Sequence, residues 1–383
     1  MRSKLILLLS LFVLAVPVFA QDDALPAPQL DGKIVLQGLN GPQGVYVADD
    51  GSVYVIDSGV GGEETIPYVN TTTQEPIDAK LGQTSRVLRL TSEGGAEEVA
   101  LLPSVATDED LMGGARLTEL NGVLYATVGT WNRALGEKVT IDHFDQVVRL
   151  GEAGIETAAD LWAHERANNP DGTDNIESHP YGITSGADGR LYVADAAANA
   201  LIAVNVETGE TETVAVFEGL PGAFPSATRK GALITDPVPT GVAIAENGMI
   251  YVSLLSGAPF IPGSAKVVQV AEDGTVSDFA TGLTMLTDLQ MGSDGNLYAT
   301  SFGMFTQQGP VPNSGSVIRI LKDGAAETVI AGLPFATALG LDANGNGYVA
   351  INGAAIPNAG MVVYYEGLTA IQGMPLPAMQ AGS

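Results

Sequence analysis

The chain has 383 residues, of which 44 are acidic and 17 are basic, so its formal charge at pH 7 is −27. A surface this acidic repels nucleic acids and anionic lipids, which makes both unsuitable partners. Cysteine is absent, and this excludes disulfides, thiolate metal sites and cysteine nucleophiles.

The first twenty residues have the pattern of a secretory signal peptide. Arg2 and Lys4 form a basic start, Leu5–Val18 form an apolar core, and Val18-Phe19-Ala20 form a small-residue cleavage site. A single-span anchor is the alternative, but the apolar run is short for a bilayer. Cleavage would leave 15 basic against 44 acidic residues, a charge of −29. We therefore expect a secreted or periplasmic protein with no membrane span after cleavage.

A hairpin signal recurs six times along the rest of the chain. In each copy an Asp-Gly or Asn-Gly pair, which suits the positive φ angles of a tight turn, precedes a strand-like run that contains a tyrosine three residues after the glycine. The copies are Asp50-Gly51…Tyr54, Asn121-Gly122…Tyr125, Asp188-Gly189…Tyr192, Asn247-Gly248…Tyr251, Asp294-Gly295…Tyr298 and Asn344-Gly345…Tyr348. This repetition predicts an all-β fold, a six-bladed β-propeller of four-stranded antiparallel blades.

The sixth repeat ends before it has a fourth strand. Its third strand is expected at Met361–Tyr365, and the missing outer strand is expected near the N-terminus, at Lys33–Leu36. A ring closed by this N-terminal strand would leave no exposed sheet edge there. The chain is then one domain over residues 32–367, with flexible segments at 21–31 and 368–383, which are rich in Pro, Ala and Gly.

The long insertions predict which face carries the function. Those at 58–85 and 129–145 follow second strands, whereas those at 159–178 and 217–239 lead into inner strands. In four-stranded meander blades both kinds of connection emerge on the same side of the ring. We therefore expect a loop-rich face over the central channel, and we expect the functional residues on it.

The insertion at 159–178 is the least repetitive part of the chain. Asp160 precedes a run that predicts a short helix, with Asp160 as its N-terminal cap. Asn168, Asn169 and Asp171 follow in an oxygen-rich loop, whose carboxylates and amides suit Ca²⁺. The alternative is a solvated loop, because Asn-Pro-Asp-Gly is also a ready turn sequence.

Further polar residues stand at the entrances of inner strands or at the ends of second strands. They are candidates for ligand binding at the channel mouth and rim, together with Asn168, Asn169 and Asp171. These further candidates are Gln43, Asp57, His179, Tyr181, Asp195, Asp236, Thr240 and Asp288. The alternative is that the ends of the channel are simply hydrated, in which case polar residues there need no ligand.

Several longer segments carry a resemblance to a known family. They are Ala159–Gly172, Pro180-Tyr181-Gly182, Asp236-Pro237-Val238-Pro239-Thr240, Pro259-Phe260-Ile261-Pro262-Gly263 and Tyr125–Gly129. With these segments the chain resembles the ScyD/ScyE family of exported bacterial proteins, among the NHL-like and TolB-like propellers. The resemblance covers residues 35–365. It implies a propeller and export, and it implies no catalytic residues.

Two functions of different classes remain open. The first is a non-catalytic binding or scaffold module, which holds a small molecule, peptide, glycan or protein partner on the loop-rich face. The alternative is a calcium-dependent lactonase- or esterase-like hydrolase that resembles gluconolactonase-like propellers. Asp57, Asp195 and Asp288 would then converge on a Ca²⁺ ion, with His179 as the base. Such lactonases carry a glutamate near the first inner strand, and Asn40–Gly44 contains none.

Overall fold

The computed structural model describes residues 31–70, 75–108, 110–130, 139–151, 154–226, 229–353 and 356–376. The expected signal peptide lies outside these residues. The described part is built mainly of strands, with one α-helix, α2 (Leu161–Asn168), and one 3-10 helix, η1 (Leu368–Ala370). None of its helices has the length and apolar character needed to cross a bilayer.

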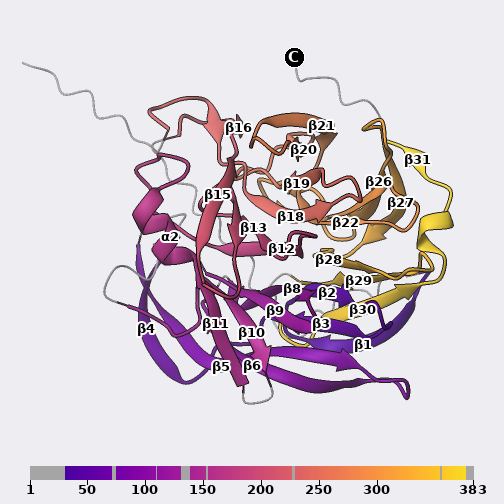
Figure 1. Ribbon diagram of the computed structural model, residues 1–383, viewed down its shortest axis with the longest axis horizontal. Coiled ribbons are helices and arrows are strands. Elements are labelled where there is room, and N and C mark those ends of the chain that lie inside the picture. The colour runs from indigo at the N-terminus through magenta and orange to yellow at the C-terminus, as the bar shows by residue number, and fades with distance from the viewer. Residues whose placement is uncertain are drawn as a thin grey trace, which may run out of the picture.

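Within the described residues, six antiparallel sheets have four or more strands. Each sheet begins with an inner strand near the centre of the molecule and continues outward in antiparallel order, and one of them takes its outer strand from β1 (Figure 1). From the inner strand outward, the sheets are β2 (Pro42–Val47), β3 (Val53–Asp57), β5 (Pro76–Leu90), β6 (Ala96–Ala106) and β7 (Leu111–Met112); β8 (Gly114–Leu120), β9 (Val123–Val128), β10 (Gln146–Gly151) and β11 (Gly154–Asp160); β12 (Pro180–Ser185), β13 (Leu191–Asp195), β14 (Ala200–Val204) and β15 (Thr211–Val216); β18 (Pro239–Ile244), β19 (Ile250–Leu254), β20 (Ala265–Val270) and β21 (Val276–Leu283); β22 (Leu286–Met291), β23 (Leu297–Ser301), β26 (Gly315–Ile320), β27 (Ala326–Leu333) and β31 (Met374–Pro375); and β28 (Ala338–Leu341), β29 (Gly347–Ile351), β30 (Gly360–Tyr365) and β1 (Lys33–Leu39).

The inner strands of neighbouring sheets contact one another around the centre of the molecule (Figure 1). β2 contacts β8 and β28, β12 contacts β8 and β18, and β22 contacts β18 and β28. Glycines permit this close approach: a Cβ added to Gly241 would lie 2.4 Å from the Leu289 nitrogen, and one on Gly44 would lie 2.5 Å from the Ala115 oxygen. Antiparallel sheets that radiate from a common axis are the architecture of a β-propeller, as the hairpin repeats predict.

The N-terminal strand pairs with the last long strand of the chain. β1 is antiparallel to β30, with Lys33 opposite Tyr364 and Leu39 opposite Gly360. The strand nearest the start of the described chain and its last long strand therefore share one sheet, and indigo β1 lies beside yellow β30 in Figure 1. The apolar cluster that contains Val45 and Val55 also includes Val362, so the first sheet packs against this last one.

Two segments that the sequence presents as irregular contain regular structure. Residues 58–85 were expected to be a loop, but β4 (Glu64–Val69) pairs with the first half of β5. This hairpin is stable because Ile66 and Tyr68 are buried in the adjacent core. Within the C-terminal segment expected to be flexible, Leu368 is fully buried and β31 pairs with β27.

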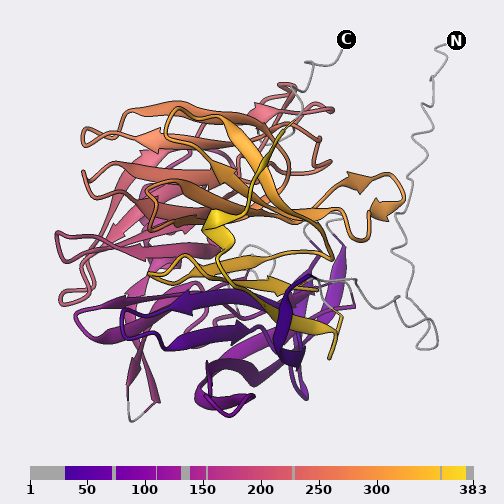
Figure 2. The ribbon, with the colours of Figure 1, turned by 90° about the vertical axis from the view of Figure 1, so that its right-hand side faces the viewer.

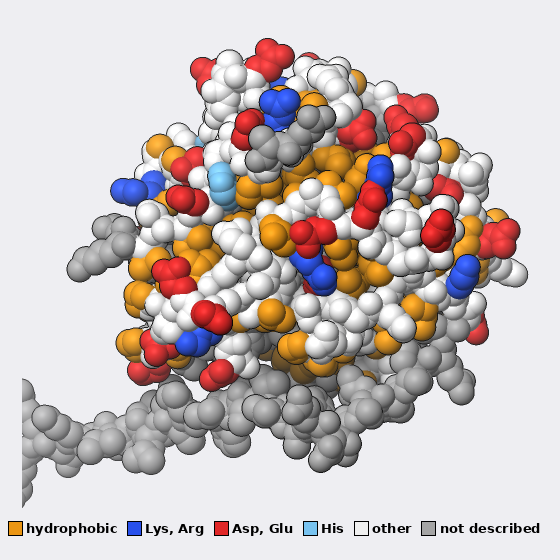
Figure 3. Space-filling model, turned by 90° about the horizontal axis from the view of Figure 1, so that it is seen from below, with side chains coloured by type: hydrophobic (Ala, Val, Ile, Leu, Met, Phe, Trp, Pro, Cys, Tyr) orange, Lys and Arg blue, Asp and Glu red, His pale blue; other side chains and the backbone are white. Residues whose placement is uncertain are grey.

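Shorter strand pairs shape the loops. β16 (Leu220–Pro221) pairs with β17 (Ile234–Thr235), and β24 (Phe305–Thr306) pairs with β25 (Gly309–Pro310). The β24–β25 hairpin projects from the body of the molecule (Figure 2). On the side seen in Figure 3 the acidic side chains are spread out rather than gathered in one patch, which suits a solvated surface.

Candidate functional site

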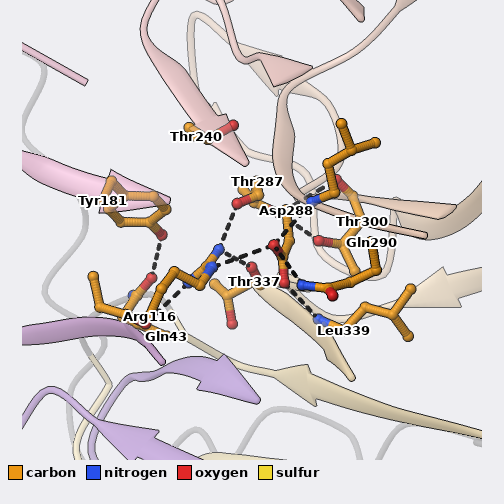
Figure 4. A network of polar contacts seen from close by, with 12 residues as sticks. Gln43, Arg116, Tyr181, Thr240, Thr287, Asp288, Gln290, Thr300, Thr337 and Leu339 are labelled. Atoms are coloured by element: carbon orange, nitrogen blue, oxygen red, sulfur yellow. Dashed lines mark hydrogen bonds and ion pairs between the residues drawn. The ribbon is translucent and has the colours of Figure 1, made fainter. Parts of the chain in front are cut away.

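A buried arginine lies among the inner strands near the centre of the molecule (Figure 4). Arg116 lies on β8 and is 3% exposed. Its guanidinium donates to the backbone oxygens of Thr287 and Thr337, and its Nε lies 3.4 Å from Asp288 Oδ1. It also stacks 4.5 Å from the ring centroid of Tyr181. One side chain thus bridges β12, β22 and the start of β28, so it ties together sheets from across the centre.

The Asp288 carboxylate is paired with Arg116 and accepts hydrogen bonds from two backbone nitrogens. The side chain is 2% exposed, and besides Arg116 it accepts hydrogen bonds from the backbone nitrogens of Leu289 at 2.8 Å and Leu339 at 2.9 Å. A buried charge is tolerated when it is paired and hydrogen-bonded in this way. Asp288 therefore acts as the counter-ion of Arg116 in the described structure.

Gln43 and Tyr181 extend the same network. The Tyr181 hydroxyl donates to Gln43 Oε1, and Gln43 Nε2 donates to the Gly353 oxygen at 2.9 Å. Burial raises the pKa of Tyr181, so its hydroxyl stays protonated and remains a donor at neutral pH. Gln43 and Tyr181 therefore lie in one network with Asp288.

Threonines link neighbouring inner strands at three of the junctions between sheets. The Thr240 hydroxyl donates to the Leu286 oxygen at 2.8 Å, that of Thr287 to the Ala336 oxygen at 3.1 Å, and that of Thr337 to the Pro42 oxygen at 2.6 Å. The last of these bonds joins the sixth sheet to the first. Thr240 therefore has a structural partner, and the recurrence of threonine at the start of inner strands is a signal that the sequence contains.

Asp57 and Asp195 occupy equivalent positions, at the ends of the second strands β3 and β13. Asp57 accepts from the Asn40 nitrogen at 2.6 Å and pairs with Arg86. Asp195 accepts from the His179 nitrogen at 2.7 Å and from the Ser178 hydroxyl at 2.6 Å. Each carboxylate thus anchors the segment that enters the inner strand of its own sheet.

Burial raises the pKa of both Asp57 and Asp195, in spite of their hydrogen-bond partners. Each of these carboxylates, like Asp288, has a separate set of partners. The described residues contain no group of three or more His, Asp or Glu side chains that could hold a metal ion. The convergence of Asp57, Asp195 and Asp288 required by the hydrolase hypothesis is therefore not found in this part of the chain.

His179 lies beside the central network, with its ring edge-on to Tyr181 at 5.7 Å between centroids. Burial lowers the pKa of His179 to about 4, so its imidazole is neutral at pH 7. A general base works best when its pKa is near the working pH, and this value is well below it.

The lowered pKa of His179 predicts an acid-dependent loss of stability. The unfolded chain binds a proton near pH 6.5 whereas the folded one resists it down to about pH 4, so the stability present above pH 6.5 falls as the pH decreases through this window. Between pH 7.5 and 5.0, the free energy of unfolding of the native protein should fall by up to about 2 kcal/mol more than that of His179→Gln. Urea unfolding of both proteins at the two pH values measures this difference; equal changes would contradict it.

The remaining candidate residues for ligand binding lie at the end of α2 and in the loop after it, outside the central network. Asp160 caps the helix by accepting from the Ala163 nitrogen, as predicted. Asn168 Nδ2 donates to the His164 oxygen at 2.9 Å, and Asp171 Oδ2 accepts from Asn199 at 2.8 Å.

Arg229 joins this loop to the segment before β18. Its Nη2 lies 2.6 Å from Asp236 Oδ1 and 3.6 Å from Asp171 Oδ2. The guanidinium of Arg229 therefore bridges the two candidate residues Asp171 and Asp236.

A separate pocket of 380 Å³ lies between the sheet of β18–β21 and the sheet of β22–β27. Loop residues Thr284 and Gly303 line it, together with Ser316 on β26 and Thr328 on β27. None of its described lining residues is charged. The side chains of Ser316 and Thr328 make no hydrogen bond to the described part of the chain, so their hydroxyls are available to a ligand. None of the residues that the sequence suggests for ligand binding lines this pocket.

No family model matches this chain, and no curated protein matches its sequence. Among solved structures, it is similar to a putative oxidoreductase (glucose dehydrogenase) from Thermus thermophilus, with 16% identity, a TM-score of 0.51, and coverage of 87% of this chain and 98% of that one. The PQQ-bound aldose sugar dehydrogenase from Streptomyces coelicolor has 13% identity, a TM-score of 0.51, and coverage of 88% and 99%. A gluconolactonase from Xanthomonas campestris has 13% identity, coverage of 87% and 98%, and a TM-score of 0.45, which is too low to support an argument.

At these identities the likeness concerns the fold alone. The similar structures are β-propellers, and the radial sheets described above agree with them. The chain is therefore a β-propeller protein, and its function has to be argued from its own residues.

Proposed function

We propose that the chain is an exported six-bladed β-propeller of the ScyD/ScyE type. In this proposal it acts as a non-catalytic binding module for a small, uncharged, hydroxyl-bearing ligand, such as part of a glycan. The observation that carries the binding role is the uncharged 380 Å³ pocket with two hydroxyls available to a ligand.

Six blades closed by the N-terminal strand are supported by three independent contacts. The inner strands contact one another in a cycle from β2 through β28 and back to β2. The Thr337 hydroxyl bonds the Pro42 oxygen across the same junction, and β1 completes the sheet of β28–β30.

The ScyD/ScyE assignment rests on the sequence segments that carry the resemblance, and the structure shows where these segments lie. Residues 159–172 form α2 and the loop after it, and Pro180–Gly182 begin β12 beside the central network. Asp236–Thr240 lead into β18, and Phe260 of the fourth segment packs against Phe305 with ring centroids 5.1 Å apart. Four of the five segments thus lie in or beside loops and strand entrances, whereas Tyr125–Gly129 lies mainly on the second strand β9.

The pocket has the size and chemistry of a site for a small neutral molecule. Its volume lies in the usual range for ligand sites, roughly 300–1,000 Å³. The Ser316 and Thr328 hydroxyls can each donate and accept a hydrogen bond, which matches the hydroxyls of a sugar. A charged ligand would find no counter-ion among the described lining residues, since none of them is charged.

The alternative function is a calcium-dependent lactonase- or esterase-like hydrolase. It would need a metal and a base at the channel mouth, where Asp288 is bound by Arg116 and two backbone nitrogens. Asp57 and Asp195 are engaged elsewhere, by Arg86 and by the segment entering β12. The saturation of these carboxylates favours the binding module.

The test is a calorimetric screen of the full chain against neutral and charged oligosaccharides. We expect saturable binding of at least one neutral glycan, and we expect Ser316→Tyr, which fills the pocket, to abolish it. Ser277→Tyr adds the same side chain at an exposed position on β21, and it should leave binding unchanged. Absence of saturable binding, or binding that survives Ser316→Tyr, would refute the proposal. Calcium-dependent turnover in a lactone and ester panel would support the hydrolase instead.

Export of the protein can be tested separately from ligand binding. N-terminal sequencing of the protein recovered outside the cytoplasm should begin at Gln21, after the predicted cleavage site. A chain that retains Met1 and sediments with the membrane fraction would indicate the uncleaved anchor.

A further inference from the structure

A buried glutamate on α2 lacks the partners that a buried charge requires. Glu165 is 1% exposed. Its Oε1 accepts only a long hydrogen bond, from the Glu177 nitrogen at 3.4 Å, and its Oε2 has no hydrogen-bond partner among the described residues. A carboxylate placed in the interior without a donor or counter-ion is strongly unfavourable. Something other than the described side chains must therefore satisfy Glu165.

A second unsatisfied oxygen lies one helical turn further on. Asn169 ends α2 in the left-handed conformation, with φ of 41°, and its backbone nitrogen donates to the Glu165 oxygen at 2.8 Å. Its side-chain nitrogen is used by the Thr173 oxygen at 2.9 Å, whereas its Oδ1 is buried with no partner. The Glu165 side chain accepts from the Glu177 nitrogen and the Asn169 side chain donates to the Thr173 oxygen, so both side chains, with their two free acceptor oxygens, lie against the loop that follows α2.

The surroundings of this site are negative. Burial is the main cause that raises the pKa of Glu165, to about 8, and the nearby charges of Asp195 and Asp171 raise it further. The C-terminal end of a helix also carries partial negative charge. Arg229, the cation near Asp171, is paired with Asp171 and Asp236 rather than with Glu165.

Either a proton or a metal ion could satisfy the buried carboxylate of Glu165. A proton would provide a single donor and could satisfy only one of the two free oxygens. A cation accepts both oxygens as ligands and also offsets the neighbouring negative charges. Ca²⁺ suits this donor set because it prefers carboxylate, amide and backbone carbonyl oxygens and tolerates irregular geometry.

We propose that Glu165 and Asn169 form a Ca²⁺ site at the end of α2, completed by backbone oxygens of residues 170–177 and by water. The described residues contain no cluster of three carboxylate or histidine ligands. The site therefore belongs to the weak class typical of extracellular modules, with a Kd of about 10⁻⁴ to 10⁻³ M. Binding would fasten the loop that leads into Ser178 and β12.

The test uses the full chain, freed of metal with EDTA and then titrated with CaCl₂ or MgCl₂. We expect 10 mM Ca²⁺ to raise the melting temperature by about 3 °C, and Mg²⁺ to raise it less. Tb³⁺ is a direct probe, because Trp162 lies three residues before Glu165 on α2 and can sensitise its emission. Ca²⁺ should displace the bound Tb³⁺.

Variants separate this site from general binding to an acidic surface. Glu165→Gln should abolish the thermal shift and the Tb³⁺ emission, whereas Glu207→Gln, which removes the same charge from an exposed turn, should leave both intact. Asn169→Gly keeps the left-handed conformation but removes Oδ1, and it should weaken Ca²⁺ binding about tenfold. A native protein without any thermal shift or emission, or a Glu165→Gln variant that retains them, would overturn the proposal.

Discussion

Replacement of Arg116 by methionine should lower the free energy of unfolding by about 3–5 kcal/mol. Methionine fills a similar volume but leaves the Asp288 carboxylate as a buried charge without its counter-ion. It also removes the donors to the Thr287 and Thr337 oxygens, which come from two different sheets. Urea unfolding at pH 7, monitored by circular dichroism, measures the loss.

The matched control is Arg149→Met, which deletes the same group from β10. Arg149 is half exposed and pairs with Glu156 at 3.8 Å, so its loss should change the free energy of unfolding by less than about 1 kcal/mol. Adding Asp288→Asn to Arg116→Met should recover part of the lost stability, because it removes the unpaired charge. An Arg116→Met protein as stable as the Arg149→Met protein would mean that the central network does not hold the sheets together.

The position of Arg116 also bears on where a ligand can bind. With the guanidinium hydrogen-bonded to three backbone oxygens and stacked on Tyr181, the polar groups of the inner-strand entrances satisfy one another. A ligand placed there would have to break several buried hydrogen bonds. A ligand in the 380 Å³ pocket beside Ser316 would not have to break these hydrogen bonds. We therefore propose that the ligand binds in this pocket.

The sequence predicts the local elements of the fold well. The strand predicted around Tyr54 is observed as β3, and Asp160 caps α2, because both features depend on neighbours within a few residues. The extension of β5 back to Pro76 was not predicted. Its pairing with β4 depends on burial of Ile66 and Tyr68 against the next sheet, which local propensity does not report.

The candidate site is only partly predictable for the same reason. Gln43, Tyr181 and Asp288 could be placed together because each stands at the entrance of an inner strand. Arg116 was missed, since its partners Thr287 and Thr337 follow it by 171 and 221 residues and are positioned only by the arrangement of the sheets. Asp57 and Asp195 were wrongly grouped with Asp288 as ligands of one ion, because the sequence does not reveal that each already has local donors.

The proposed ring closure can be tested with an engineered disulfide, since the native chain has no cysteine. Gln37 and Met361 are direct partners on the antiparallel strands β1 and β30. Antiparallel partners lie about 4.5–5.5 Å apart between Cα atoms, within the range that a disulfide spans. Cysteines at both positions should therefore form a bond that joins the two ends of the ring.

The oxidised Gln37→Cys/Met361→Cys protein should be about 5 kcal/mol more stable than its reduced form, because the bond closes a loop of more than three hundred residues in the unfolded chain. The control pair, Gln269→Cys/Ser277→Cys, joins facing residues of one hairpin, β20–β21, and should gain only about 2.5 kcal/mol. Urea unfolding with and without reductant, after a thiol assay has verified each bond, compares the two gains. If the pair between β1 and β30 gains no more than the hairpin pair, or cannot be oxidised, the N-terminal strand does not close the ring in solution. The larger gain is expected only if the two ends of the chain meet in one sheet of the folded protein.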